Sequence, residues 1–268
     1  METASTLGYN GVEGAREFLD PPQPEALSRM LDSEGLLLPG GYYAANWFDL
    51  DWRPREFDAL RQRAELYAGV GANYLVAASA GSPNRMATAG HMNDGRSDGL
   101  SDYQWGCLGE AISLAGEIVQ VEFEMQLVFH NHAGTYVETA HEIDRFITLT
   151  DPNNVFLAPD TGHLAYAGID STDFIARNIS RIRYVHTKDI DLDLLSDGIK
   201  TGTGYHELVR DGVFTPVGAG SLDFVAILGV LSEADYDGWL IVEQDFTLSD
   251  PDVAAGMSID HLKSLLGD

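Results

Sequence analysis

The sequence predicts a parallel α/β protein of the (β/α)₈ barrel class, and two observations support this prediction. First, short apolar runs of strand length alternate with amphipathic stretches of helical length along the chain. This alternation is typical of a parallel sheet with right-handed helical crossovers. Second, polar motifs follow four of the later apolar runs directly, and the loops after the strands form the active face of such barrels.

Seven strands are predicted, whereas a closed barrel of this class needs eight. Each is a short run enriched in apolar residues and bounded by turn-forming ones. The predicted strands are Tyr9–Glu13, Leu36–Ala45, Asn73–Ala78, Leu127–His132, Asn154–Ala158, Ile182–His186 and Trp239–Val242. The strand expected to come first is missing, so we expect a start codon placed too late or a real truncation. An open flavodoxin-type sheet is the alternative, but no glycine-rich phosphate loop follows the first predicted strand.

Helices are predicted between the strands and after the last one, because apolar residues recur there at helical spacing. The predicted helices are Pro24–Asp32, Pro54–Val70, 101–119, Glu138–Leu149, Asp173–Ile179, Leu222–Leu231 and Pro251–Leu266. Ser101 is the expected N-cap of the third. A long polar loop is predicted at Gly81–Leu100, and a second long segment, Asp191–Gly220, carries glycine and proline punctuation. With no repeat or linker, residues 1–268 are predicted to form a single domain.

Composition and charge exclude several classes of function. The chain has 42 acidic and 16 basic residues, a formal net charge of −26. This argues against binding nucleic acid or an anionic membrane, because both require a positive surface. The apolar runs are too short to span a bilayer, and the first residues lack the features of a secretory signal. The single cysteine, Cys107, cannot form an internal disulfide and fits a reducing compartment. We therefore expect a cytoplasmic protein.

The four polar motifs at the predicted strand ends carry the chemistry. They are His130-Asn131-His132, Asp160-Thr161-Gly162-His163, His186-Thr187-Lys188-Asp189 and Glu243-Gln244-Asp245. Residues i and i+2 of a strand point to the same side. His130 should therefore share a face with His132, His186 with Lys188, and Glu243 with Asp245. Imidazole and carboxylate groups gathered at one end of a barrel suit a divalent cation such as Mn²⁺, Mg²⁺, Co²⁺ or Zn²⁺.

Each of these residues also has a purely structural interpretation. Asp160 could cap a helix or close a turn, and His186 could be a hydrogen-bonded barrel residue. Glu243 follows an apolar run, where a buried carboxylate needs a partner. Lys188 could be an acid, a base or a neutraliser of an oxyanion, or it could simply form a salt bridge with Asp189 or Glu243. His163 could support the metal ligands, transfer protons or serve the fold alone.

Weaker candidates lie elsewhere in the chain. Trp47 follows the predicted strand Leu36–Ala45 and could stack on a sugar ring or belong to the core. His91 lies in the predicted loop after the next strand, where it could cover a substrate or lie on the surface. His130, His132 and Asp245 are further candidates for substrate contacts.

Several of these runs together resemble the xylose-isomerase-like TIM barrels of the sugar phosphate isomerase/epimerase superfamily, and within them the inosose dehydratase branch. The resemblance spans about residues 6–265. The runs that carry it are Phe129–Arg145, Asp160–Leu164, Tyr166–Gly168, Val185–Asp189, Pro216–Phe224 and Tyr236–Glu243.

The resemblance implies one divalent metal, with Mn²⁺ or Co²⁺ favoured. Its ligands would be a carboxylate after the fifth barrel strand, Asp160, His186 and Glu243. Glu138 is the first choice for the fifth-strand ligand, and His132 or His130 could replace it. His163 and Lys188 are the expected catalytic residues.

The activity implied by the resemblance is dehydration of a keto-inositol through a metal-stabilised enediolate. A sugar isomerase or epimerase acting on a ketose or keto-sugar is the alternative, and an inactive or non-catalytic truncated barrel is a further one. In each enzymatic case the expected partner is a small polyhydroxylated carbonyl substrate. A homo-oligomer is possible.

Overall fold

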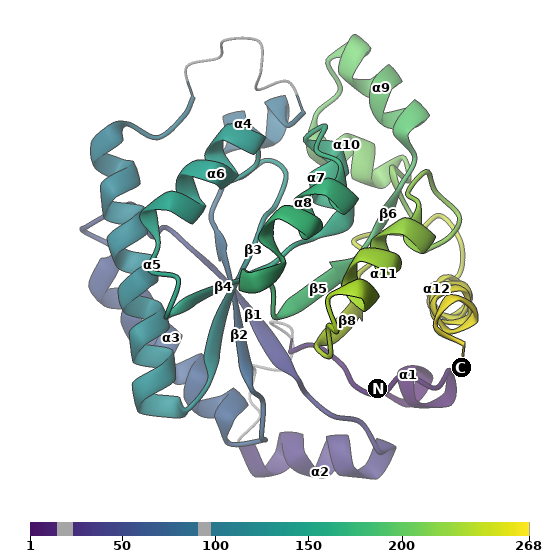
Figure 1. Ribbon diagram of the computed structural model, residues 1–268, viewed down its shortest axis with the longest axis horizontal. Helices are drawn as coiled ribbons and strands as arrows, with labels where there is room; N and C mark the ends of the chain where they lie inside the picture. The colour runs from purple at the N-terminus through teal and green to yellow at the C-terminus, as the bar shows by residue number, and fades with distance from the viewer. Residues whose placement is uncertain (15–23, 91–97, 268) are drawn as a thin grey trace. The chain divides into compact units, whose positions relative to one another are not determined.

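The computed structural model describes residues 1–14, 24–90 and 98–267 (Figure 1). The described chain forms two compact units, each built from three separate stretches of sequence. The first unit contains Met1–Ala80, Leu100–His130 and Arg145–Leu157, and the second contains Gly81–Gly99, Asn131–Asp144 and Ala158–Asp268. Within the described residues, none of the helices combines the length and the apolar character needed to span a bilayer.

The first unit contains a parallel sheet covered by helices. Its strands are β1 (Gly40–Ala45), β2 (Tyr74–Ser79), β3 (Gln126–His130) and β4 (Val155–Ala158), and its helices are α1 (Glu2–Thr6), α2 (Pro24–Glu34), α3 (Arg53–Ala68) and α5 (Asp102–Phe123). The strands lie in the order β1-β2-β3-β4, and β2 pairs in parallel with both β1 and β3. The chain passes between the units within α6 (Ala140–Leu149) and at the last residue of β4.

The first predicted strand lies beside β1, although it forms isolated bridges there and not a continuous ladder. Gly11 bridges in parallel to Leu37, and Gly14 bridges in parallel to Gly41. The predicted strand from Leu36 becomes regular only at Gly40, because Pro39 has no N–H to donate to a ladder.

Helix α5 begins at the predicted N-cap, which confirms this part of the sequence analysis. The Ser101 side chain accepts a hydrogen bond from the Gln104 backbone N–H, and the Gln104 side chain accepts one from the Ser101 backbone. This reciprocal capping box satisfies two N–H groups that the helix itself leaves unpaired. Helix α5 packs against β3 and lies beside α3, which packs against β1 (Figure 1).

The second unit holds short strands among many helices. Its strands are β5 (Tyr184–Thr187), β6 (Asp189–Ile190), β7 (Phe214–Thr215) and β8 (Trp239–Val242), and its helices are α4 (Pro83–Thr88), α7 (Thr161–Tyr166), α8 (Ser171–Asn178), α9 (Leu192–Thr201), α10 (Tyr205–Arg210), α11 (Phe224–Glu233) and α12 (Pro251–Leu266), with a 3₁₀ turn η3 (Ile179–Arg181). Strand β5 pairs in parallel with β8, and β6 pairs antiparallel with β7. Asp160, just past β4, bridges in parallel to His186 of β5.

Two segments without regular periodicity in the sequence contain structure that the prediction missed. The predicted loop from Gly81 contains α4, which has Ser82 as its N-cap and Pro83 in its first turn. The segment Asp191–Gly220 contains α9, α10 and β7. Most of these elements are too short to show helical or strand periodicity. They are held by a shared apolar core of Ala89, Ala133, Ala165, Tyr166, Ile190, Leu195, Tyr205, Leu208, Val213 and Phe214.

Two glycines of α5 provide a matched test of how this helix packs in the first unit. A methyl group at Gly116 would lie 2.3 Å from the backbone oxygen of Asn154, whereas one at Gly106 would meet nothing within 4 Å. Gly116→Ala should therefore lower the free energy of unfolding by about 1–3 kcal/mol through overpacking. Gly106→Ala should raise it by about 0.5–1 kcal/mol through helix propensity. Urea unfolding measures both, and a stabilising Gly116→Ala would contradict this close approach.

Candidate active site

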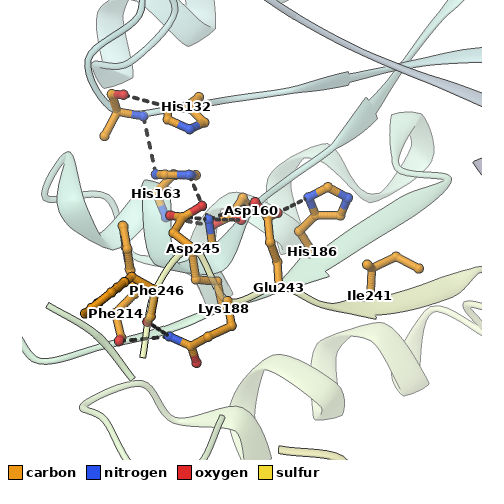
Figure 2. Close-up of polar contacts among 12 residues, drawn as sticks. His132, Asp160, His163, His186, Lys188, Phe214, Ile241, Glu243, Asp245 and Phe246 are labelled. Atoms are coloured by element: carbon orange, nitrogen blue, oxygen red, sulfur yellow. Dashed lines mark hydrogen bonds and ion pairs between the residues drawn. The ribbon is translucent and has the colours of Figure 1, made fainter. Parts of the chain in front are cut away.

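The parallel pairing of β5 with β8 brings two of the predicted motifs to the same edge. Thr187, at the end of β5, lies opposite Val242, at the end of β8. Lys188 and Glu243 are the next residues on the two strands, and the Glu243 N–H donates to the Thr187 carbonyl. Figure 2 shows that these side chains meet those of Asp160 and His163. The local strand register therefore assembles the site.

Asp160 has two different oxygen environments. Its Oδ1 accepts a hydrogen bond of 2.7 Å from the His163 backbone N–H, so Asp160 is the N-cap of α7. Its Oδ2 is buried, has no hydrogen-bond partner among the described residues and lies 3.5 Å from the Lys188 Nζ. Burial raises the pKa of Asp160 to about 7, an effect that Glu243 reinforces and Lys188 opposes. The capping interpretation is therefore correct, and it leaves one oxygen facing the site.

Lys188 lies at the centre of the cluster and is fully buried (Figure 2). Its Nζ is 3.0 Å from the His163 Nε2, the Glu243 Oε1 and the Asp245 Oδ2. Burial alone would lower the pKa of Lys188, but the charges of Asp160, Glu243 and Asp245 outweigh it and raise that pKa well above its ordinary value. Lys188 is therefore a cation at neutral pH.

Gly162 is required because the Lys188 stem crosses α7 at this position. A methyl group at Gly162 would lie 2.7 Å from the Lys188 Cγ. Asp189, the next residue, faces elsewhere, and its carboxylate accepts hydrogen bonds from the backbone N–H groups of Gly218 and Gly220. Of the two ion pairs considered for Lys188 in the sequence, the structure contains the one with Glu243.

An ammonium group can only donate, so the Nε2 of His163, 3.0 Å from the Lys188 Nζ, is assigned as the acceptor and this imidazole as neutral. The Ala133 N–H lies 3.4 Å from the Nδ1 of the same ring, and this longer contact is the weaker of the two. His132 lies against His163, with ring centroids 3.9 Å apart and planes inclined by 35°. Burial and the nearby Lys188 charge lower the pKa of His132. The two imidazoles thus lie beside the ammonium, and the lowered pKa of His132 avoids a second buried cation.

The donor set suits a divalent metal. Asp160, His163 and Glu243 each offer a ligand atom, and these atoms lie within 4.8 Å of one another. One of these groups, the Oδ2 of Asp160, is a buried carboxylate oxygen without a hydrogen-bond donor. Mixed carboxylate and imidazole donors fit Zn²⁺, Mn²⁺ or Co²⁺. His186 contacts the Glu243 carboxylate, with its Nδ1 2.6 Å from the Glu243 Oε2.

Glu138 lies in a different set of contacts. Its Oε1 accepts from the Gly90 N–H and its Oε2 from the Gly134 N–H, at 2.8 and 2.7 Å. The guanidinium of Arg85 lies 3.7 Å from Glu138 and makes two hydrogen bonds of 2.8 Å to Glu142. Burial raises the pKa of Glu138, and the two N–H groups partly offset this. One of these N–H groups follows α4 and the other lies in the loop after β3, so both oxygens already have partners. The ligand role of Glu138 stays a prediction.

The weaker candidates are distributed over both units. Trp47, in the first unit, is buried, and its Nε1 donates to the Ala78 carbonyl, as expected of a core residue. His130 ends β3 in the first unit, with its ring edge-on to Tyr42. His91 lies outside the described residues. Asp245 belongs to the cluster through Lys188.

Two further residues belong to the cluster and were not expected. The Tyr205 hydroxyl donates to the Asp245 Oδ2 at 3.1 Å, and burial together with Asp245 raises the pKa of Tyr205 well above its ordinary value. The Lys188 Nζ lies 4.8 Å from the centre of the Phe214 ring. Both residues come from the segment Asp191–Gly220, which has no strand-end motif. No signal in the sequence marked them.

Comparison with known proteins agrees with the architecture and the motifs. The model of the xylose isomerase-like TIM barrel family matches residues 1–265. The chain therefore belongs to this family.

Two relatives that are similar in sequence over most of the chain are named for the same reaction. A chain from Geobacillus kaustophilus named inosose dehydratase is 36% identical, and the match covers 99% of this chain and 86% of that one. An inosose dehydratase from Lacticaseibacillus casei is 32% identical over 91% of this chain and 80% of its own length. The solved structure of a 3-keto-D-glucoside 4-epimerase from E. coli superimposes with a TM-score of 0.73, covering 97% of this chain and 90% of that one. At 17% identity, this last likeness concerns the fold alone.

Two arginine–carboxylate pairs that each have two hydrogen bonds differ in burial and predict different stabilities. Arg85 is fully buried and binds Glu142 through its two terminal nitrogens, whereas Arg61, 40% exposed, binds Glu122 through Nε and one terminal nitrogen. Arg85→Met should cost about 3–5 kcal/mol, because it leaves a buried carboxylate unpaired. Arg61→Met should cost at most about 1 kcal/mol. Guanidinium unfolding compares the two, and similar costs would contradict the buried position of Arg85.

Proposed function

We propose that this chain is a divalent-metal-dependent lyase that dehydrates a keto-inositol. The observation that carries the proposal is the buried cluster in which the Lys188 ammonium meets His163, Asp160 and Glu243. A protonated amine, a neutral imidazole and two carboxylates are the groups that such a reaction needs. The inosose dehydratases that are 30–36% identical to this chain support the choice of substrate class.

The metal would be held by Asp160, Glu243 and an imidazole. We assign this imidazole to His186, which the family resemblance gives as a ligand and which contacts Glu243. His163, whose ring nitrogen lies with the donor atoms of Asp160 and Glu243, is the second candidate. The contact between His186 and Glu243 also fixes the orientation of the carboxylate. When bound, the ion would act as a Lewis acid that polarises the ketone and acidifies the adjacent C–H bond. Mn²⁺ or Co²⁺ is the favoured ion.

Proton transfer would be the task of His163 and Lys188. Dehydration next to a ketone removes a proton from the α-carbon and expels the β-hydroxyl group as water. The neutral His163 suits the role of base. The raised pKa of Lys188 keeps it protonated, so it suits neutralising negative charge on the carbonyl oxygen. Tyr205, also held protonated, would be a second donor, for the hydroxyl group that leaves as water.

An isomerase or epimerase would share the removal of the α-proton. It would return the proton to another carbon or to the opposite face, without losing water. The epimerase of known structure supports this alternative only through the fold. The two reactions differ in their products, so one assay separates them.

Incubation with 2-keto-myo-inositol and Mn²⁺ should generate an ultraviolet-absorbing dione, and chelation of the metal should abolish the reaction. Absorbance measures the product, and elemental analysis of the purified protein measures the metal. A proton NMR screen with ketoses serves as the comparison. Ketose conversion without dione formation would favour the isomerase or epimerase. Failure to take up stoichiometric Mn²⁺, Co²⁺ or Zn²⁺ would contradict a metal-dependent function.

Glu243→Gln should remove both metal binding and turnover, each by about 100-fold or more, because it exchanges a charged ligand for a neutral amide. Calorimetric titration with Mn²⁺ and the dione assay measure the two effects. Glu233→Gln, at an exposed position near the end of α11, is the matched control and should change neither. Full activity of Glu243→Gln would exclude Glu243 from the site.

A further inference from the structure

The ammonium of Lys188 contacts the oxygens that the proposed function assigns to the metal. It lies 3.5 Å from the Oδ2 of Asp160 and 3.0 Å from the Oε1 of Glu243. These are the oxygens that remain after the other oxygen of each residue is used: Asp160 Oδ1 caps α7, and Glu243 Oε2 meets His186. The same ammonium also faces His163, the third member of the donor group.

Two cations cannot occupy this position together at low cost. Lys188 and Asp160 are fully buried and Glu243 is 29% exposed, so water screens only weakly the repulsion between an ammonium and a divalent ion that share the two carboxylates. A carboxylate oxygen that accepts a hydrogen bond from an ammonium is also a weaker ligand for a metal. One of the two cations must therefore withdraw when the other binds.

We propose that Lys188 and the divalent ion compete for Asp160 and Glu243, so that metal binding requires the ammonium to withdraw toward Asp245. This inference rests on the proposed metal-dependent function and concerns what limits the metal affinity. The protein then exists as a balance between a lysine-occupied and a lysine-withdrawn arrangement. The apparent metal affinity is reduced by the fraction of molecules in the first arrangement.

The surroundings of Lys188 provide a position to which it can withdraw. The Oδ2 of Asp245 accepts both from Lys188 and from the hydroxyl of Tyr205, and Asp245 is outside the donor group. The ring of Phe214 lies on the same side, 4.8 Å from the ammonium. These partners would keep the charge of Lys188 compensated after it leaves Asp160 and Glu243.

A purely structural lysine leads to the opposite expectation. If Lys188 only holds the carboxylates in position for the metal, its loss would disorganise the ligands and weaken metal binding. If Lys188 competes, its loss would strengthen metal binding and destabilise the metal-free protein. The sign of the change in affinity therefore separates the two roles.

The experiment is a calorimetric titration of the full chain with Mn²⁺, after chelation and dialysis, for the wild type and Lys188→Met. We expect Lys188→Met to bind Mn²⁺ about tenfold more tightly or better, since the competing arrangement is removed. Lys200→Met is the matched control: it removes the same charge at an exposed ion pair with Asp197 and should change the affinity less than about twofold. Lys188→Arg retains the cation and should bind Mn²⁺ no more tightly than the wild type.

Thermal unfolding provides a second readout that does not depend on activity. The metal-free Lys188→Met should melt at a lower temperature than the wild type, and saturating Mn²⁺ should raise its Tm by more than it raises that of the wild type. If Lys188→Met does not fold without metal, Lys188→Gln replaces it, because its amide can still donate to Glu243 without a charge.

The outcomes separate this inference from the proposed function. Wild type that binds Mn²⁺, with Lys188→Met binding equally or more weakly, overturns the competition and leaves the metal-dependent function intact. Absence of binding of Mn²⁺, Co²⁺ and Zn²⁺ by every variant overturns both. Tighter binding by Lys188→Met together with an unchanged Lys200→Met supports both.

Discussion

The described part of the second unit depends on the compensation of one buried charge. Lys188 is removed from water, and a buried ammonium is tolerated only where anions and hydrogen-bond acceptors surround it. Those acceptors come from the end of β4, the start of α7 and the residues after β8. Displacing any of these elements would leave a charge uncompensated. The positions of the groups that we propose to be catalytic and the local fold are therefore set by the same interaction.

Asp160 connects this electrostatic constraint to secondary structure. Helix α7 has only six residues, and such a helix is not stable through propensity alone. One oxygen of Asp160 caps the helix while the other faces Lys188, and Gly162 allows the lysine stem to pass. His163, which shares α7 with Gly162, is thereby brought to the ammonium. A substitution intended to change only the chemistry at Asp160 would also remove a helix cap.

The sequence allowed prediction of those parts of the site that follow from local rules. Alternation along a strand predicted that His186 and Lys188 would share a face, and the parallel strand order predicted that Glu243 would lie near them. Contacts that depend on packing could not be predicted in this way. Tyr205 reaches Asp245 only through the packing of α10 in the shared apolar core. Glu138 accepts hydrogen bonds from backbone N–H groups of separate turns. No periodicity or spacing in the sequence encodes such contacts.

A lysine at position 188 fits the proposal that the cation there withdraws when a divalent ion binds. Thirteen of the sixteen basic residues in this chain are arginines, and Lys188 is one of the three lysines. An arginine would bind two carboxylates through a rigid planar fork, which favours a permanent bridge. A lysine carries a compact charge on a flexible stem and can exchange one acceptor for another without losing hydrogen-bond geometry. This chain uses arginine for its buried pair with Glu142, and the lysine at position 188 fits the movable charge that we propose.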